Sequence, residues 1–270
     1  MNEKERVLSL LKEYNLYAKK SFGQNFLIND GIINRIFKSL EASSFDDVIE
    51  IGPGLGSLTN KLADESKKLI CVDADRDMVT VLNDLYTEKT NVKIIESDFL
   101  RYNPNLETRQ DNRLFVGNLP YNITSRLIEY FLDCGFKRMA IMVQKEVAIK
   151  LDYKSSGKEC SPLGAFLKSI GEYKLVTLVD SSCFYPQPKV DSAFIIIDKT
   201  KEYDFSLYSI YKILFKDPNK TISNCLKQFK EYINSLNYLK ENDDEILFKR
   251  ARQLQPNQLY DLALIIKEHK

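Results

Sequence analysis

The residues best suited to chemistry in this sequence are Asn118, Leu119, Pro120 and Tyr121, which follow the apolar run RLFVG. Residues of these types could hold an amino group that is attached to an aromatic ring. The lone pair of such an amino nitrogen attacks poorly until the N–H bonds are turned out of the ring plane. The Asn118 side-chain oxygen and the Leu119 carbonyl can each accept one of those hydrogens, while Pro120 stiffens the turn. Tyr121 offers a face on which a base can stack. The segment indicates methyl transfer to an exocyclic amine by positioning and electrostatics, although four residues alone could form an ordinary capped turn.

A glycine-rich turn follows an earlier apolar run, in EIGPGLGSLT, residues 50–59. Gly52 and Gly54 let the backbone take positive φ and approach a ligand closely, and the helix that follows begins with free N–H donors. A nucleotide-like cofactor is the expected occupant. Ser57 stands where a dinucleotide-binding fingerprint needs its third glycine, which disfavours an NAD-dependent dehydrogenase.

Two acids end the next two strand-like segments. Asp73 lies about 20 residues after Gly52, where a carboxylate can accept hydrogen bonds from the two hydroxyls of a ribose. Asp98 is placed to take the amino group of an adenine. Each acid alone could be a cap or a solvated residue, but open α/β sheets bind ligands at successive strand ends, so the pair favours adenosine binding. Because the segment at Asn118 can hold an amine, it favours S-adenosylmethionine over NAD as the cofactor that contains this adenosine.

These residues must be positioned by an α/β fold with a parallel sheet, because strand and helix patterns alternate through the first part of the chain. The expected strands are 46–51, 68–74, 92–98, 113–118, 138–144, 173–180 and 189–198, and the expected helices between them are 57–65, 76–86 and 123–135. Helical spacing alone follows, in 205–215, 221–236, 244–254 and 256–269. We therefore expect a catalytic domain over residues 1–200 and an all-helical domain over residues 201–270.

Composition narrows the chemistry further. The five cysteines are widely spread with no C-x-x-C pair, and His269 is the only histidine, so metal sites and histidine-based acid–base catalysis are not expected. The net charge of +1 does not by itself indicate a nucleic-acid partner. No secretory leader or membrane-spanning run is evident, and a cytoplasmic protein is expected.

Several motifs together resemble a known family. KKSFGQNFLIN (residues 19–29), EIGPGLGSLT, VDAD, SDFL, GNLPYNITS, VQKEVA and FYPQPKVDSAF occur in the order and spacing of the ribosomal RNA adenine dimethyltransferases. The sequence resembles most closely the small-subunit dimethyladenosine transferases, over about residues 10–200 and more weakly through the helical tail. The resemblance implies a Rossmann-like, class I methyltransferase sheet of seven strands with one antiparallel, and a C-terminal helical domain that docks RNA.

The resemblance also implies roles for individual residues. S-adenosylmethionine would be bound, without a metal ion, by Asn25, Leu27, Gly52, Gly54, Asp73, Asp98 and Asn118. Asn118, Leu119, Pro120 and Tyr121 would position the target adenine, and Phe184 would be a second stacking aromatic that closes a sandwich with Tyr121 around a flipped-out base. Lys19 and Lys20 are either phosphate contacts or solvated lysines.

The implied target is a pair of neighbouring adenines in a hairpin loop near the 3′ end of small-subunit ribosomal RNA, each methylated twice at N6 during ribosome biogenesis by a monomer with no membrane partner. Two alternatives stay open: a large-subunit enzyme that confers macrolide resistance, and a non-catalytic RNA-binding or transcription factor on the same fold. FYPQPKVDS and VQKEVA favour the small-subunit enzymes. The chain departs from the family at Asp73, where glutamate is usual, and in FKDPNKTISNCL (residues 215–226), where Asp217 and Pro218 interrupt a basic run.

Overall fold

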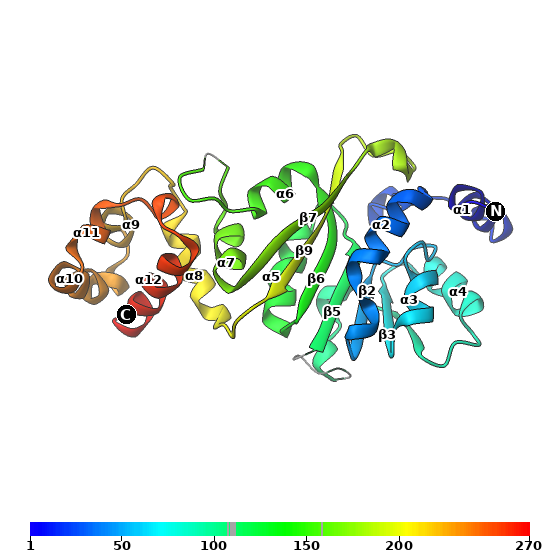
Figure 1. The fold of residues 1–270 in the computed structure, drawn as a ribbon, viewed down its shortest axis with the longest axis horizontal. Helices are drawn as coiled ribbons and strands as arrows, with labels where there is room; N and C mark the ends of the chain where they lie inside the picture. The colour runs from blue at the N-terminus through cyan, green and yellow to red at the C-terminus, as the bar shows by residue number, and fades with distance from the viewer. Residues whose placement is uncertain (107, 109–111, 158) are drawn as a thin grey trace. The chain divides into compact units, whose positions relative to one another are not determined.

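The computed structural model describes residues 1–106, 108, 112–157 and 159–270, and it contains one seven-stranded sheet (Figure 1). The strand order is β4-β3-β2-β5-β6-β9-β7. Neighbours from β4 to β6 pair parallel, and β9 pairs antiparallel with β6. The strands are β2 Asp47–Ile51, β3 Leu69–Asp73, β4 Val92–Glu96, β5 Arg113–Asn118, β6 Arg138–Gln144, β7 Gly171–Val179 and β9 Ser192–Lys199. The predicted fold class is confirmed, and each predicted strand is present.

Helices cover both faces of the sheet, because successive residues of a strand point to opposite sides. Leu114 and Val116 of β5 belong to one core cluster with Ile36 of helix α2. The ring of Phe115 between them stacks on Phe131 of α5, with 4.5 Å between ring centroids. The helices of this part are α2 Asp30–Leu40, α3 Thr59–Glu65, α4 Arg76–Leu85, α5 Thr124–Cys134 and α6 Lys145–Leu151. Of these, α3, α4 and α5 fall within the predicted ranges.

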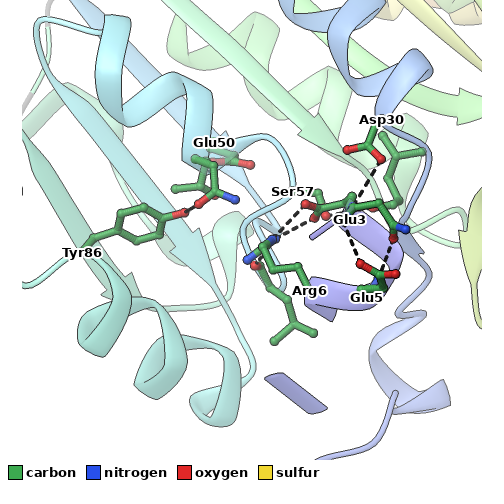
Figure 2. A network of polar contacts seen from close by, with 12 residues as sticks. Glu3, Glu5, Arg6, Asp30, Glu50, Ser57 and Tyr86 are labelled. Atoms are coloured by element: carbon green, nitrogen blue, oxygen red, sulfur yellow. Dashed lines mark hydrogen bonds and ion pairs between the residues drawn. The ribbon is translucent and has the colours of Figure 1, made fainter. Parts of the chain in front are cut away.

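The N-terminal helix α1 (Glu3–Glu13) is absent from the predicted elements. Its apolar side chains join a core cluster with Phe26 and with Leu55 of the glycine-rich loop. Arg6 donates hydrogen bonds to Glu3 and to the backbone oxygen of Leu55, the latter at 2.8 Å (Figure 2). Helix α1 therefore covers the glycine-rich loop and holds one of its carbonyl groups.

A two-stranded sheet joins segments that lie far apart in the sequence. Strands β1 (Phe26–Leu27) and β8 (Phe184–Tyr185) pair antiparallel, with Phe26 opposite Tyr185 and Leu27 opposite Phe184. This pairing was not predicted, since two-residue strands carry no periodic pattern. It fixes the GQNFL motif against the FYPQPK turn.

The second compact unit contains residues 149–173 and 199–270, while residues 1–148 and 174–198 form the first. Its helices are α7 Pro162–Ile170, α8 Tyr208–Leu214, α9 Ile222–Leu226, α10 Ile233–Asn242, α11 Asp244–Phe248 and α12 Pro256–Glu268. Helix α7 precedes β7 yet contacts α8 and α12, so this unit includes more chain than the predicted 201–270, whose boundary stays a prediction. Among the described residues, no helix is both long and apolar enough to span a membrane.

Two helical predictions in this unit are wrong in their extent. The predicted helix 244–254 ends at Phe248, because Lys249 is extended, with φ −78° and ψ 158°. The apolar spacing over 221–236 predicts one helix, but α9 ends at Leu226 and α10 begins at Ile233. Phe229 between them is extended, with φ −128° and ψ 117°. The rings of Phe229 and Tyr232 contact each other edge to face, with 6.2 Å between centroids, so this apolar spacing serves a packed turn.

Candidate active site

A cavity lies at the carboxyl ends of β2, β3, β4 and β5, where the predicted site residues converge. Its lining includes every residue predicted for the site except Phe184: Asn25, Leu27, Gly52, Gly54, Asp73, Asp98, Asn118, Leu119, Pro120 and Tyr121. The ends of four neighbouring strands meet here because these strands are parallel and in register. One fold therefore brings together residues from separate parts of the sequence.

The glycine-rich loop after β2 forms the floor of this cavity. Gly52 and Gly54 have φ of +62° and +58°, a region that other residues rarely adopt. A Cβ atom at Gly54 would lie 3.2 Å from the ring of Phe26. The loop therefore requires glycine both for its conformation and for its close approach to a neighbouring segment.

Asp73 ends β3 with its carboxylate at the cavity. One oxygen accepts a hydrogen bond from the Gly54 N–H at 3.2 Å, and the other accepts one from the Asp75 N–H at 2.9 Å. Burial raises the pKa of Asp73 to about 6, although these backbone donors act in the opposite direction. The carboxylate is therefore held in place and still has lone pairs for the hydroxyl groups of a ligand.

Asp98 follows β4 and has two roles in its neighbourhood. Its carboxylate lines the cavity and also accepts a hydrogen bond from the Leu100 N–H at 3.1 Å, which caps a short 3₁₀ turn. The nitrogen Nε of Arg101 lies 3.9 Å from its second oxygen. Asp98 thus serves as a cap and remains available to a ligand at the cavity.

Glu50 is an acid in the cavity wall that the sequence motifs did not single out. It is 2% exposed, and its carboxylate accepts a hydrogen bond from the Thr59 hydroxyl at 2.7 Å. Burial raises the pKa of Glu50 to about 7. The signal in the sequence is an acid between apolar residues in strand DVIEI, after Asp47 at its start. Once buried, this acid has to be satisfied by its neighbours.

Asn118 ends β5, and its side-chain amide has a fixed orientation. The amide nitrogen donates a hydrogen bond to the backbone oxygen of Asn25, with 2.8 Å between the two atoms. Because the nitrogen is used in this way, the amide oxygen remains as the group that can accept a hydrogen from a ligand. The Leu119 side chain is buried, and the Pro120 carbonyl accepts the Ile123 N–H at 3.2 Å, so the turn after Asn118 is rigid.

The two aromatic residues predicted to stack on a base lie in different surroundings. Tyr121 lines the cavity, and its hydroxyl lies 2.5 Å from the hydroxyl oxygen of Ser192, which has no exposed surface. Phe184 is 2% exposed and belongs to the core cluster that also contains Leu27. The structure does not bring Phe184 to the cavity, because its pairing with Leu27 turns the ring into the core; the neighbouring Tyr185 is 40% exposed.

No group of three or more His, Cys, Asp or Glu side chains within the described residues is arranged to hold a metal ion. The residues that surround the cavity carry carboxylates, side-chain amides, aromatic rings and aliphatic side chains. A mostly parallel sheet with an antiparallel β9, a glycine-rich loop after β2, acids after β3 and β4 and Asn-Leu-Pro-Tyr after β5 define a class I, S-adenosylmethionine-dependent methyltransferase.

The family follows from comparison with known proteins. Residues 15–266 match the ribosomal RNA adenine dimethylase family, and the chain belongs to it. It is 37% identical over 258 residues to the ribosomal RNA small subunit methyltransferase A of Mycoplasmopsis pulmonis (strain UAB CTIP), covering 93% of this chain and 99% of that protein. The protein of the same name from Clostridium botulinum (strain Loch Maree / Type A3) is 34% identical over 260 residues, covering 93% and 90%.

A solved structure agrees with this assignment. The crystal structure of a dimethyladenosine transferase from Plasmodium falciparum is similar with a TM-score of 0.74 and 26% identity, over 89% of this chain and 97% of that chain. The predicted family, fold and enzyme class are therefore confirmed: the protein is an rRNA adenine dimethylase.

Proposed function

We propose that the protein transfers methyl groups from S-adenosylmethionine to N6 of two adjacent adenines in the 3′-terminal hairpin loop of small-subunit ribosomal RNA, during ribosome biogenesis. The observation that carries the proposal is the Asn118 amide, whose nitrogen is held by Asn25 so that its oxygen is left for an amine hydrogen. The names of the relatives from Mycoplasmopsis and Clostridium support the small subunit as the target.

The cavity fits the proposed methyl donor. Asp73 would accept hydrogen bonds from the ribose hydroxyls and Asp98 would accept one from the adenine amino group, while Gly52 and Gly54 allow the backbone to lie close to the ligand. Residues of the 22–27 segment, including Asn25 and Leu27, would contact the methionine portion. When bound, S-adenosylmethionine supplies an electrophilic methyl group on a sulfonium, so the proposed chemistry requires no metal ion.

The protein's own residues would prepare the acceptor amine. The Asn118 oxygen and the Leu119 carbonyl each accept one N–H of the adenine amino group, which turns the remaining lone pair out of conjugation with the ring. Pro120 keeps the carbonyl fixed, and Tyr121 holds the extruded base by stacking. Catalysis then comes from positioning and electrostatics. The stacking role of Phe184 stays a prediction, because its ring would have to leave the core.

The C-terminal helices would help to dock the RNA substrate on a monomeric enzyme in the cytoplasm. In the segment that departs from the family, the Lys220 ammonium lies 3.9 Å from Asp217, and the Lys216 ammonium lies 5.6 Å from the centre of the Phe229 ring. Lysines that contact neighbours within the protein contribute less to phosphate binding. We therefore propose that this unit binds RNA more weakly than a continuous basic run would.

The proposal is tested by methyl transfer from labelled S-adenosylmethionine to small ribosomal subunits that lack dimethyladenosine, with large subunits in parallel, followed by mapping of the modified bases. We expect label only on the small subunit, in two adjacent hairpin adenines. Label on the large subunit would move the protein to the macrolide-resistance enzymes. Cofactor binding without any label would instead favour an RNA-binding role.

A further inference from the structure

The cavity wall opposite the strand ends is a segment with little secondary structure of its own. Residues 19–27, here named the wall segment, contain one 3₁₀ turn and the two-residue strand β1. Its residues from Phe22 to Leu27 line the cavity. Backbone pairing with β8 holds Phe26 and Leu27, and side-chain contacts with the rest of the protein hold the residues before them.

Three polar contacts connect the beginning of the wall segment to the residues after β3. The Lys19 ammonium lies 2.6 Å from a carboxylate oxygen of Asp75 and 2.6 Å from one of Asp77. The Gln24 amide nitrogen donates to the second oxygen of Asp75 at 2.7 Å. The Gln24 side-chain oxygen accepts a hydrogen bond from the backbone N–H of Lys19 at 2.8 Å. Lys19, Gln24 and Asp75 therefore each contact the other two.

Asp75 is an unusual place for a charge, because it is only 2% exposed. A buried carboxylate is stable only when it is paired and hydrogen-bonded. Lys19 supplies the charge, Gln24 supplies a donor, and the Asp77 N–H supplies a third contact at 3.1 Å. The neighbouring Lys20 is exposed to solvent, so the structure separates two lysines that the sequence could not distinguish.

The same contacts connect to the proposed cofactor site on one side and to the proposed amine site on the other. On one side, the Asp75 N–H donates to Asp73, the proposed ribose ligand, at 2.9 Å. On the other side, the backbone oxygen of Asn25, in the wall segment, holds the Asn118 amide nitrogen at 2.8 Å. A displacement of the wall segment would therefore change the cofactor wall and release the Asn118 amide at the same time.

We propose that Lys19, Gln24 and Asp75 form a latch that positions the wall segment against the strand ends, and through it both the methyl donor and the Asn118 amide. The inference rests on the proposed function and adds positioning residues to it. In this proposal Lys19 positions the cofactor site and does not contact an RNA phosphate.

The test compares Lys19→Met with Lys20→Met in the full chain, by calorimetric titration with S-adenosylmethionine and by steady-state methyl transfer. We expect Lys19→Met to weaken cofactor binding by about tenfold and to lower kcat as well, since the Asn118 amide loses its fixed orientation. Lys20→Met should leave both unchanged. Lys19→Arg should restore most of the affinity, because a guanidinium can pair with both carboxylates.

Further variants test whether the effect of Lys19→Met on cofactor binding comes from loss of folding. Asp75→Asn keeps the cap on α4 but removes the charge, and we expect it to weaken cofactor binding as Lys19→Met does. The double variant should be no worse than either single one, because coupled residues are non-additive. Gln24→Leu removes two hydrogen bonds but no charge, and it should give a smaller effect in the same direction, with an unchanged melting temperature.

The outcomes separate this inference from the proposed function. Wild-type protein that binds no S-adenosylmethionine would overturn the proposed function itself. Wild-type protein that binds and methylates, together with Lys19→Met at normal cofactor affinity and kcat, would overturn the latch alone. Loss of RNA affinity in Lys19→Met at normal cofactor affinity would also overturn it and return Lys19 to a phosphate contact.

Discussion

The two walls of the active-site cavity are built in different ways. The strand-end wall carries Asp73 and Asn118 at the ends of β3 and β5, and Asp98 two residues after β4. These strands belong to one parallel backbone ladder that runs through β2. The wall segment, residues 19–27, has a backbone pairing for Phe26 and Leu27 alone, with β8, and its earlier residues contact distant parts of the sequence through ion pairs and hydrogen bonds. In our proposals the strand-end wall holds the reacting groups and the wall segment positions them, so substitutions on the two sides should produce different kinetic effects.

The largest effect is expected on the strand-end wall, from Asn118→Ala. The variant loses one acceptor for the amine hydrogens, and removal of one such group typically lowers kcat by about a hundred- to a thousandfold. Cofactor affinity should change little, since the side chain's contact to Asn25 is one of several that hold the wall segment. Single-turnover methyl transfer and calorimetry measure the two quantities, with the exposed neighbour Asn122→Ala as the control. Equal losses in kcat and cofactor affinity would contradict this division between the walls.

A smaller effect is expected at Tyr121, whose ring and hydroxyl can be tested separately. Tyr121→Ala removes a stacking face worth about 1–3 kcal/mol, or roughly five- to 150-fold in kcat/KM for RNA. Tyr121→Phe keeps the ring but loses the contact to Ser192, so we expect a loss of about fivefold, the size of one hydrogen bond.

Ser192→Ala should match Tyr121→Phe, and the double variant should be no worse than either if the hydroxyl pair only orients the ring. A double-mutant cycle on kcat measures this coupling. Additive losses would show that Ser192 acts on something other than Tyr121.

The pH dependence of cofactor binding tests Asp73. In the proposed site the ionised carboxylate would accept the ribose hydrogens, and the pKa of about 6 means that it is protonated as the pH falls through 6. Affinity should therefore be full at pH 7 and fall by about tenfold at pH 5. Asp73→Asn should bind more weakly and lose this dependence. If the dependence persists in Asp73→Asn, the buried Glu50, with a pKa of about 7, is the titrating group.

The smallest effect is expected from Phe184→Leu. Because the ring packs in the core beside Leu27, a substitution of similar shape should change the stability by under about 1.5 kcal/mol and kcat by under about threefold. Thermal unfolding and steady-state kinetics check both. A tenfold loss of kcat at unchanged stability would establish instead the base-stacking role that the family resemblance implies.

The strand-end wall was predictable from sequence because its signals are local. An apolar run followed by an acid or an amide marks a strand and its carboxyl end, and parallel pairing then brings Asp73, Asp98 and Asn118 together. The wall segment was recognisable only as a motif. Nothing local indicates that Lys19 pairs with Asp75 while Lys20 is exposed, or that Phe184 turns into the core opposite Leu27. These facts depend on contacts between distant residues, which a single sequence does not encode in a periodic pattern.

Helix α1 has a practical consequence for anyone who prepares shortened forms of this protein. The family match begins at residue 15, so a boundary drawn by similarity would discard the helix. Such a shortened chain would leave the apolar sides of Phe26 and Leu55 open to water and would free the Leu55 carbonyl from Arg6. The smallest unit fit for ligand-binding work is therefore longer than the segment that matches the family, and it should include helix α1 from its first turn.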